Sequence, residues 1–229
     1  MERIKIAFMF LVLGSFIACK SGISVSEVIE IKKGEISTVH LVSKKEIKEM
    51  NGLKIGNIVL KENSNLDWNF LKSKLIETGK KYGTNLIIVN NVGYNLKGYG
   101  FYLEGEMYFS KKIISESQEC KVGFIRDRFE SVLGSAFSIK IKVNDLELGE
   151  LKREKSQAYA SANCNEIVKV QLNNKEYEVL LKGKSKFFKI GKQTGGSSNG
   201  IGIQIGISGL SVLEIEEEEL GKLLYWQNK

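Results

Sequence analysis

The residues of this chain that could carry out chemistry are few and widely separated. The chain has one histidine, His40, which stands between Val39 and Leu41 in an alternating stretch. Metal binding and general-base catalysis both need partner side chains at suitable spacing, and the sequence places none near His40. We interpret His40 as a structural or solvent-facing residue, and we predict no metal site and no catalytic residue.

Two other segments resemble ion-binding sequences only superficially. Gly195–Gly200 lacks the Gly-Lys-Ser/Thr ending of a phosphate-binding loop and leads into a strand pattern, so we predict a plain loop. The run Glu216–Glu219 belongs to a predicted helix, around which adjacent carboxylates point in different directions. We interpret this run as solvated, and we predict no cofactor.

Tyrosines provide the best surface hypothesis. A tyrosine ring offers flat apolar area and a hydroxyl group, which suits stacking on a sugar or on a protein partner. Strands are also rich in tyrosine for packing reasons alone, and that alternative stays open. The residues of this possible binding surface are Tyr94, Tyr99, Tyr102 and Tyr108.

The pattern of the first nineteen residues predicts an export signal. Arg3 and Lys5 give a basic start, and the apolar run Ile6–Ala18 is shorter than the ~20 residues of a spanning helix. Phe16-Ile17-Ala18-Cys19 resembles the lipobox of bacterial lipoproteins, which are cleaved before the cysteine and acylated on its thiol. The alternatives are an ordinary secretory signal with a chance cysteine, or an uncleaved anchor.

Several expectations follow from the lipoprotein resemblance. Residues 1–18 are a signal peptide, Cys19 is the lipid attachment site, and the lipid bilayer is a partner through acylated Cys19. Lys20 replaces the aspartate that retains many lipoproteins at the inner membrane, so we expect the outer membrane, with the periplasmic or surface face undecided. Cys120 and Cys164 then remain as an even pair in an oxidising compartment, where a disulfide and two free buried cysteines are both open.

Composition fits a folded, exported body of two domains. The chain has 229 residues, a formal net charge of +7, 42% hydrophobic residues and 27% charged residues. Its lysines are scattered among glutamates and form no continuous stripe, which indicates a solvated surface rather than an anion-binding patch. Nucleic acid is excluded as a partner of an exported protein that has no binding motif.

The first half of the mature chain predicts an α+β domain. We expect a lipidated tether at 19–26, a domain at 27–112 and a linker at 113–119. Strands are predicted at 27–31 and 37–42, joined by a Lys33-Gly34 turn, and then at 54–61, 85–89 and 99–109; residues 90–98 form a polar connection. One helix is predicted at 66–82, capped by Asn63–Asn65 and ended by Gly83.

A helix that ends KKYGTN, the strand LIIV and a closing strand with GEMYF resemble the small βαββ domains of bacterial envelope lipoproteins. The envelope-stress sensor lipoprotein of the Rcs pathway belongs to that group. The sensor uses disulfides in this region, whereas residues 20–119 contain no cysteine, so its sensing chemistry is not carried over.

The second half, 120–229, predicts an antiparallel β-sandwich or barrel-like domain. Asn144-Asp145 is the clearest turn, and a closing helix is expected at 216–225. The run FSIKIKVNDLELGEL resembles the family called domain of unknown function 2846, which implies a fold without a known reaction. Many members have a Pro-Gly-x-His turn where this chain has Asn165-Glu166-Ile167. Strands are predicted at 120–126, 137–143, 146–151, 158–162, 166–172, 176–181, 186–190, 201–208 and 210–215.

The predicted fold class is therefore α+β or mainly β. The predicted function is that of a membrane-anchored envelope lipoprotein, not an enzyme, with a binding or structural role and an envelope protein or glycan as partner. The alternative is a hydrolase or accessory protein acting on cell-envelope glycan or peptidoglycan. A hydrolase needs convergent carboxylates, or a nucleophile with a base, and the sequence nominates neither.

Overall fold

The chain is described by a computed structural model over residues 21–29, 36–47, 49–95, 98–114, 119–126, 138–192, 204–207 and 210–229. The predicted signal peptide, Cys19, the Lys33-Gly34 turn and the Gly195–Gly200 loop lie outside these ranges. The described chain is mostly β-strand. Its elements are β1 (Gly22–Ser26), β2 (His40–Ser43), β3 (Glu49–Glu62), α2 (Trp68–Lys81), β4 (Leu86–Tyr94), β5 (Phe101–Ile114), β6 (Cys120–Arg126), β7 (Ile139–Val143), β8 (Leu146–Leu151), β9 (Lys155–Ser161), β10 (Ile167–Leu172), β11 (Lys175–Leu180), β12 (Lys186–Lys192), β13 (Gln204–Ile207), β14 (Leu210–Ile215) and α3 (Glu218–Gln227).

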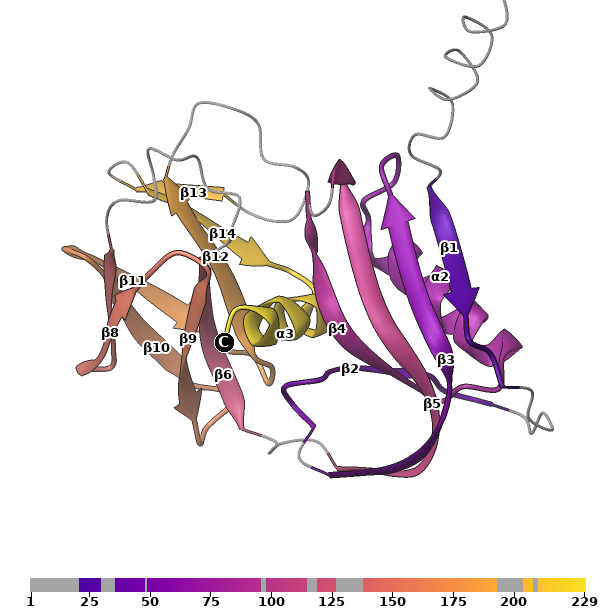
Figure 1. Ribbon diagram of the computed structural model, residues 1–229. Coiled ribbons are helices and arrows are strands. Elements are labelled where there is room, and N and C mark those ends of the chain that lie inside the picture. The colour runs from indigo at the N-terminus through magenta and orange to yellow at the C-terminus, as the bar shows by residue number, and fades with distance from the viewer. Residues whose placement is uncertain are drawn as a thin grey trace, which may run out of the picture.

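Within the described ranges the strands form three sheets (Figure 1). The first sheet has the order β1-β3-β5-β4-β2, the second β13-β14-β12-β6-β9, and the third β11-β10-β7-β8. Figure 1 shows α3 between the first sheet and the second, while the third sheet lies at the far side of the second. Most neighbouring strands are antiparallel, but β2 pairs with β4 and β6 with β12 in parallel.

The first sheet is built around the long pair β3 and β5. Phe101, Leu103 and Met107 alternate along β5, and all three are fully buried against the helix side of the sheet. This alternation places one apolar face inward and confirms the half-buried strand predicted at 99–109. The strand continues further than predicted, to Ile114, and so enters the segment expected to be a linker.

Helix α2 covers the inner face of the first sheet. Asp67, rather than Asn63–Asn65, is its N-cap and accepts a hydrogen bond from the Phe70 backbone N–H at 2.9 Å. The chain leaves the helix at Gly83, whose φ of +72° suits a residue without a side chain. Among the helices of the described residues, none is both long and apolar enough to cross a membrane.

Three local predictions in the first half are wrong. Residues 27–29, the described part of the strand predicted at 27–31, are not in a strand, and β1 instead occupies 22–26, inside the segment expected to be a tether. Among the described residues β1 and β2 do not pair with each other as the hairpin expected there would require, since β1 pairs with β3 and β2 with β4. The polar connection expected at 90–98 begins later, because β4 continues to Tyr94 along the long strand β5. In each case a neighbouring strand provides hydrogen bonds that local composition does not reveal.

The second and third sheets pack face to face as a β-sandwich. Phe124 and Phe188 from the second sheet stack at 6.1 Å in a core that also holds Ile141 and Val170 from the third. The turn predicted at Asn144-Asp145 is confirmed, with φ of 45° and 67°, as a two-residue turn with both residues left-handed requires.

A single apolar cluster joins the first sheet to the second. Adjacent residues of β12 face opposite ways: Phe187 belongs to the cluster shared with α2 and the first sheet, and Phe188 to the sandwich core. Gly123 and Gly221 lie so close to the Phe187 ring that a Cβ on either would overlap it. The first core therefore crosses the boundary expected at 113–119.

Candidate functional site

Two adjoining hollows lie where α3 meets the first and second sheets. A cleft of about 740 Å³ runs between β2 and the start of α3, and a smaller hollow of about 220 Å³ adjoins it beside the start of β6. The two hollows share the side chains of Glu46, Lys184, Glu218 and Lys222. We refer to them together as the joint cleft, which is the candidate functional site.

The acidic run at the start of α3 is bound to neighbouring elements. Three of its glutamates have partners on α2 or on the turn before β12, so the interpretation of the whole run as solvated is wrong. Negative charge at the first turn also suits the dipole of α3. The partners are the Asn69 amide for Glu217 at 3.1 Å, the Ser185 backbone N–H for Glu218 at 3.0 Å, and the Lys72 ammonium for Glu219 at 2.6 Å.

Glu46 contributes a buried carboxylate to the joint cleft. Its side chain is 3% exposed, and its Oε1 lies 2.5 Å from Nζ of Lys222 on α3. Glu46 follows β2 in a turn whose backbone is fixed by a hydrogen bond from Lys44 N–H to the Val89 carbonyl. A buried carboxylate is costly without a cation, so this ion pair holds α3 against the first sheet.

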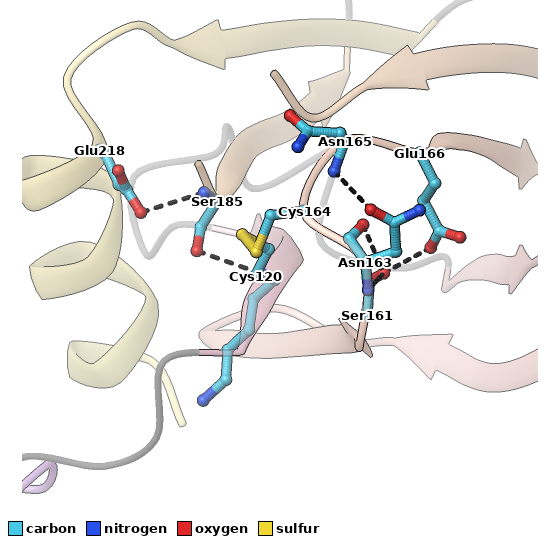
Figure 2. Close-up of a disulfide and its surroundings, with 9 residues drawn as sticks. Cys120, Ser161, Asn163, Cys164, Asn165, Glu166, Ser185 and Glu218 are labelled. Carbon is cyan, nitrogen blue, oxygen red and sulfur yellow. Dashed lines mark hydrogen bonds between the residues drawn. A yellow bond between two sulfur atoms is a disulfide. The ribbon is translucent and has the colours of Figure 1, made fainter. Parts of the chain in front are cut away.

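The wall of the smaller hollow contains a disulfide between Cys120 and Cys164 (Figure 2). Their α-carbons lie 5.3 Å apart. The sequence left the pairing open, and the structure joins the two residues because β6 and the loop after β9 meet there. Next to the bond, the Gly183 N–H donates to the Cys164 carbonyl at 2.7 Å, and the Lys121 N–H donates to Ser185 Oγ at 3.1 Å.

These contacts form a continuous connection from the disulfide to α3. Ser185 accepts through its hydroxyl from Lys121, next to Cys120, and donates through its backbone N–H to Glu218. Figure 2 shows Ser185 between the disulfide and Glu218. The disulfide therefore fixes the turn on which the start of α3 rests.

Aromatic side chains line the inner wall of the smaller hollow. Phe187 and Tyr225 lie 5.9 Å apart, and Tyr225 meets Trp226 edge to face at 5.5 Å. Nζ of Lys121 lies 5.5 Å from the Trp226 ring centroid. The site thus combines apolar rings inside with charged groups at its opening.

Lys184 is the exposed cation at this opening. It lines both hollows, and no hydrogen bond or ion pair joins its ammonium group to another residue in the described ranges. His40 is also exposed and lines the larger hollow, which agrees with its solvent-facing interpretation. Within the described residues, no group of three or more His, Cys, Asp or Glu could hold a metal ion.

The structure does not bring the four predicted tyrosines onto one surface. Tyr94 is buried in the core under α2, and its hydroxyl donates to the Leu66 carbonyl at 3.3 Å. Burial, together with the charge of Asp67, raises the pKa of Tyr94 to about 12. Tyr94 is therefore a core residue.

The other three tyrosines lie in two places outside the core cluster that holds Tyr94. Tyr99 and Tyr102 stack at 6.3 Å near one end of the first sheet. Tyr108 lies six positions further along β5, where its hydroxyl donates to Glu106 at 3.3 Å. The hydrogen bond from Lys54 to Glu106 lowers the pKa of that carboxyl, and burial raises the pKa of the Tyr108 hydroxyl.

Sequence reasoning missed the residues of the joint cleft. Glu46, Ser185 and Lys222 come from separate parts of the chain, and none belongs to a recognisable motif. Their only signal was position: Glu46 and Ser185 lie in turns beside strands, and Lys222 lies on the one short helix after the last strand.

No protein-family model, curated protein or solved structure gives a significant match to this chain. The resemblances to βαββ envelope domains and to domain of unknown function 2846 gain no support from these comparisons and stay predictions.

Proposed function

We propose that this protein is a bacterial envelope lipoprotein, tethered through acylated Cys19, that binds an acidic glycan in the joint cleft without catalysing a reaction. The single observation that carries the binding role is the joint cleft itself. At about 740 Å³ its larger hollow falls within the usual range of ligand sites. The export signal and the disulfide both support a location outside the cytoplasm, and the outer membrane remains the proposed address.

The charges of the cleft favour binding over hydrolysis. Four glutamates of the joint cleft, Glu46, Glu217, Glu218 and Glu219, are each bound to a side chain or backbone group that holds the fold together. The other two, Glu216 and Glu119, line different hollows. A glycosidase needs two carboxylates facing a common sugar, one of them free to exchange a proton. Carboxylates with structural partners are poorly suited to that role.

The ligand class follows from Lys184, the exposed cation at the opening of both hollows. Carboxylates on a sugar or on its peptide substituents pair with an ammonium group. The larger hollow is otherwise lined by more glutamates than lysines, and Tyr225 and Trp226 are only 6% and 4% exposed, so the recognised feature is a single carboxylate placed at Lys184. This feature favours an acidic glycan over a neutral one.

Binding is tested by sedimenting the purified protein with isolated peptidoglycan sacculi, with insoluble cellulose as the neutral polymer. We expect cosedimentation with sacculi, and a loss of several-fold in Lys184→Glu. Lys175→Glu makes the same charge change on the exposed edge strand β11 and should bind like the parent. Equal loss in both variants, or equal binding to cellulose, would contradict a ligand held in the joint cleft.

Acylation is tested separately by growing cells with an alkyne fatty acid and labelling the protein with an azide dye. We expect label on the parent and none on Cys19→Ala, which should accumulate as precursor or soluble protein. Label retained on Cys19→Ala would show that the lipoprotein assignment is wrong.

A further inference from the structure

We propose that one end of the first sheet, formed by Gly22, Lys61 and Tyr99, rests on the phospholipid headgroups of the bilayer that holds Cys19. This inference rests on the proposed acylation of Cys19, and it adds the orientation of the protein on the membrane. It assigns a partner, the bilayer surface, to a part of the molecule outside the joint cleft.

The distance between the lipid and the fold is short. Cys19 lies three residues before Gly22, and three extended residues span at most about 11 Å. Strand β1 is not a free tether, because it pairs with β3 along its whole length, with Gly22 opposite Lys61. Each headgroup layer of a bilayer is about 6 Å thick. An acylated Cys19 therefore holds this end of the sheet at headgroup level.

The side chains at this end suit that position. Nζ of Lys61 lies 4.8 Å from the ring centroid of Tyr99, which stacks on Tyr102. Tyrosine and lysine are residue types that lie at the level of lipid headgroups, where the ring is half-buried and the cation meets phosphate. Lys61 and Tyr99 are both partly exposed.

The carboxylates nearby do not oppose this contact. Glu62, next to Lys61, is buried and accepts hydrogen bonds from Lys74, from Ser64 and from the Asn63 backbone. Asp67 caps α2, where the positive end of the helix dipole offsets its charge. Glu104, diagonally across from Lys61 in the sheet, accepts a hydrogen bond from the Tyr102 hydroxyl at 3.1 Å. A phosphate therefore meets Lys61 beside carboxylates that already have hydrogen-bond partners.

The joint cleft lies toward the opposite end of the first sheet. Across the sheet, Gly22 is paired with Lys61 and Lys61 with Tyr102, which form one row of cross-strand neighbours. His40, Leu86 and Tyr108 form another such row. Six residues of β5 separate the two rows, about 20 Å along the strand. Figure 1 shows the start of β1 at the top of the first sheet and β2 at the bottom. The joint cleft thus lies toward the end of the first sheet that is farther from the bilayer.

Quenching of tryptophan by lipid tests this orientation. The acylated full chain is reconstituted in phosphatidylglycerol–phosphatidylethanolamine vesicles that contain acyl chains brominated near the headgroup. Tyr99→Trp and Asn65→Trp report on the proposed contact end; Asn65 is exposed and lies three residues after β3 ends beside Phe101. Leu53→Trp, at a side chain 51% exposed near the other end of the sheet, is the matched control. The parent, with its buried Trp68 and Trp226, supplies the baseline.

We expect the additional tryptophan fluorescence of Tyr99→Trp and of Asn65→Trp to be largely quenched in brominated vesicles. The additional fluorescence of Leu53→Trp should be retained. Equal quenching at both ends, or stronger quenching at position 53, would overturn the orientation while the lipoprotein assignment stands. A chain that is not acylated and does not float with vesicles would overturn both. Urea midpoints equal to that of the parent establish that each variant is folded.

Discussion

Lys222 on α3 forms an ion pair with Glu46 across the joint between the first sheet and α3, with 2.5 Å between Nζ and Oε1. The glutamate is buried, while the lysine side chain is 41% exposed. The pair is therefore unequal: removal of the lysine leaves a buried charge without a partner, and removal of the glutamate leaves a lysine that water can solvate.

This asymmetry predicts the outcome of substitutions at the pair. Lys222→Met should lower the free energy of unfolding by about 1–3 kcal/mol, below the usual cost of breaking a buried pair because Lys222 is partly solvated. Glu46→Gln should cost less, and the double variant should recover part of the loss of Lys222→Met. Urea denaturation measures all three. Lys72→Met, which breaks the more exposed pair with Glu219, should cost less than about 1 kcal/mol.

Glu62 should make stability fall in acid. Burial opposes its charge, but hydrogen bonds from Lys74, from Ser64 and from the Asn63 backbone lower its pKa to about 2. The folded state therefore binds its proton less readily than the unfolded state. This stabilisation, about 3 kcal/mol, is present above the unfolded pKa near 4.5 and is lost as the pH falls toward 2.

The measurement is the urea midpoint between pH 5 and pH 2. Glu62→Gln should flatten the pH dependence in that interval and should be less stable than the parent at pH 5. Glu77→Gln, at an exposed position of α2, is the control and should follow the parent curve. A Glu62→Gln curve parallel to that of the parent would contradict the assigned hydrogen bonds.

The disulfide should stabilise the second unit. Cys120 and Cys164 are separated by 44 residues, and the chain-entropy model gives about 4 kcal/mol for a loop of this size. Cys120→Ser with Cys164→Ser should therefore unfold about 2–4 kcal/mol more easily. Thiol labelling of the unfolded, acylated parent should find no reactive thiol until reductant is added. Two reactive thiols without reductant would show that the bond is absent.

Cleavage between Ile114 and Glu119 should not separate the two halves. Leu223 and Leu224 of α3 belong to the same apolar cluster as Val39 and Leu41 of the first half. We expect limited proteolysis to give two fragments on a denaturing gel that elute together in gel filtration. Fragments that separate in buffer and stay folded would instead support the independent domains expected from the sequence.

Local sequence determined the elements whose pattern repeats over a short distance. The apolar positions Trp68, Leu71 and Leu75 recur at helical spacing and form α2, and Asn144-Asp145 forms the turn that its residue types favour. The alternation of apolar and polar residues likewise predicted strand β7, and it predicted which side chains of β5 face the core under α2. These outcomes depend on residues close in the chain, so the pattern alone is informative.

Only the tertiary structure decided which surfaces meet. Tyr94 and Tyr102 look equivalent in the sequence, yet a bulge in β4 and the sheet register turn Tyr94 into the core and keep Tyr102 away from that face. Glu46 and Lys222 carry no local sign of their pairing, because the energy of a buried charge depends on a cation 176 positions away along the chain. The prediction of an export signal that ends at Cys19 rests on the sequence alone, whereas the joint cleft exists only because α3 packs between two sheets (Figure 1).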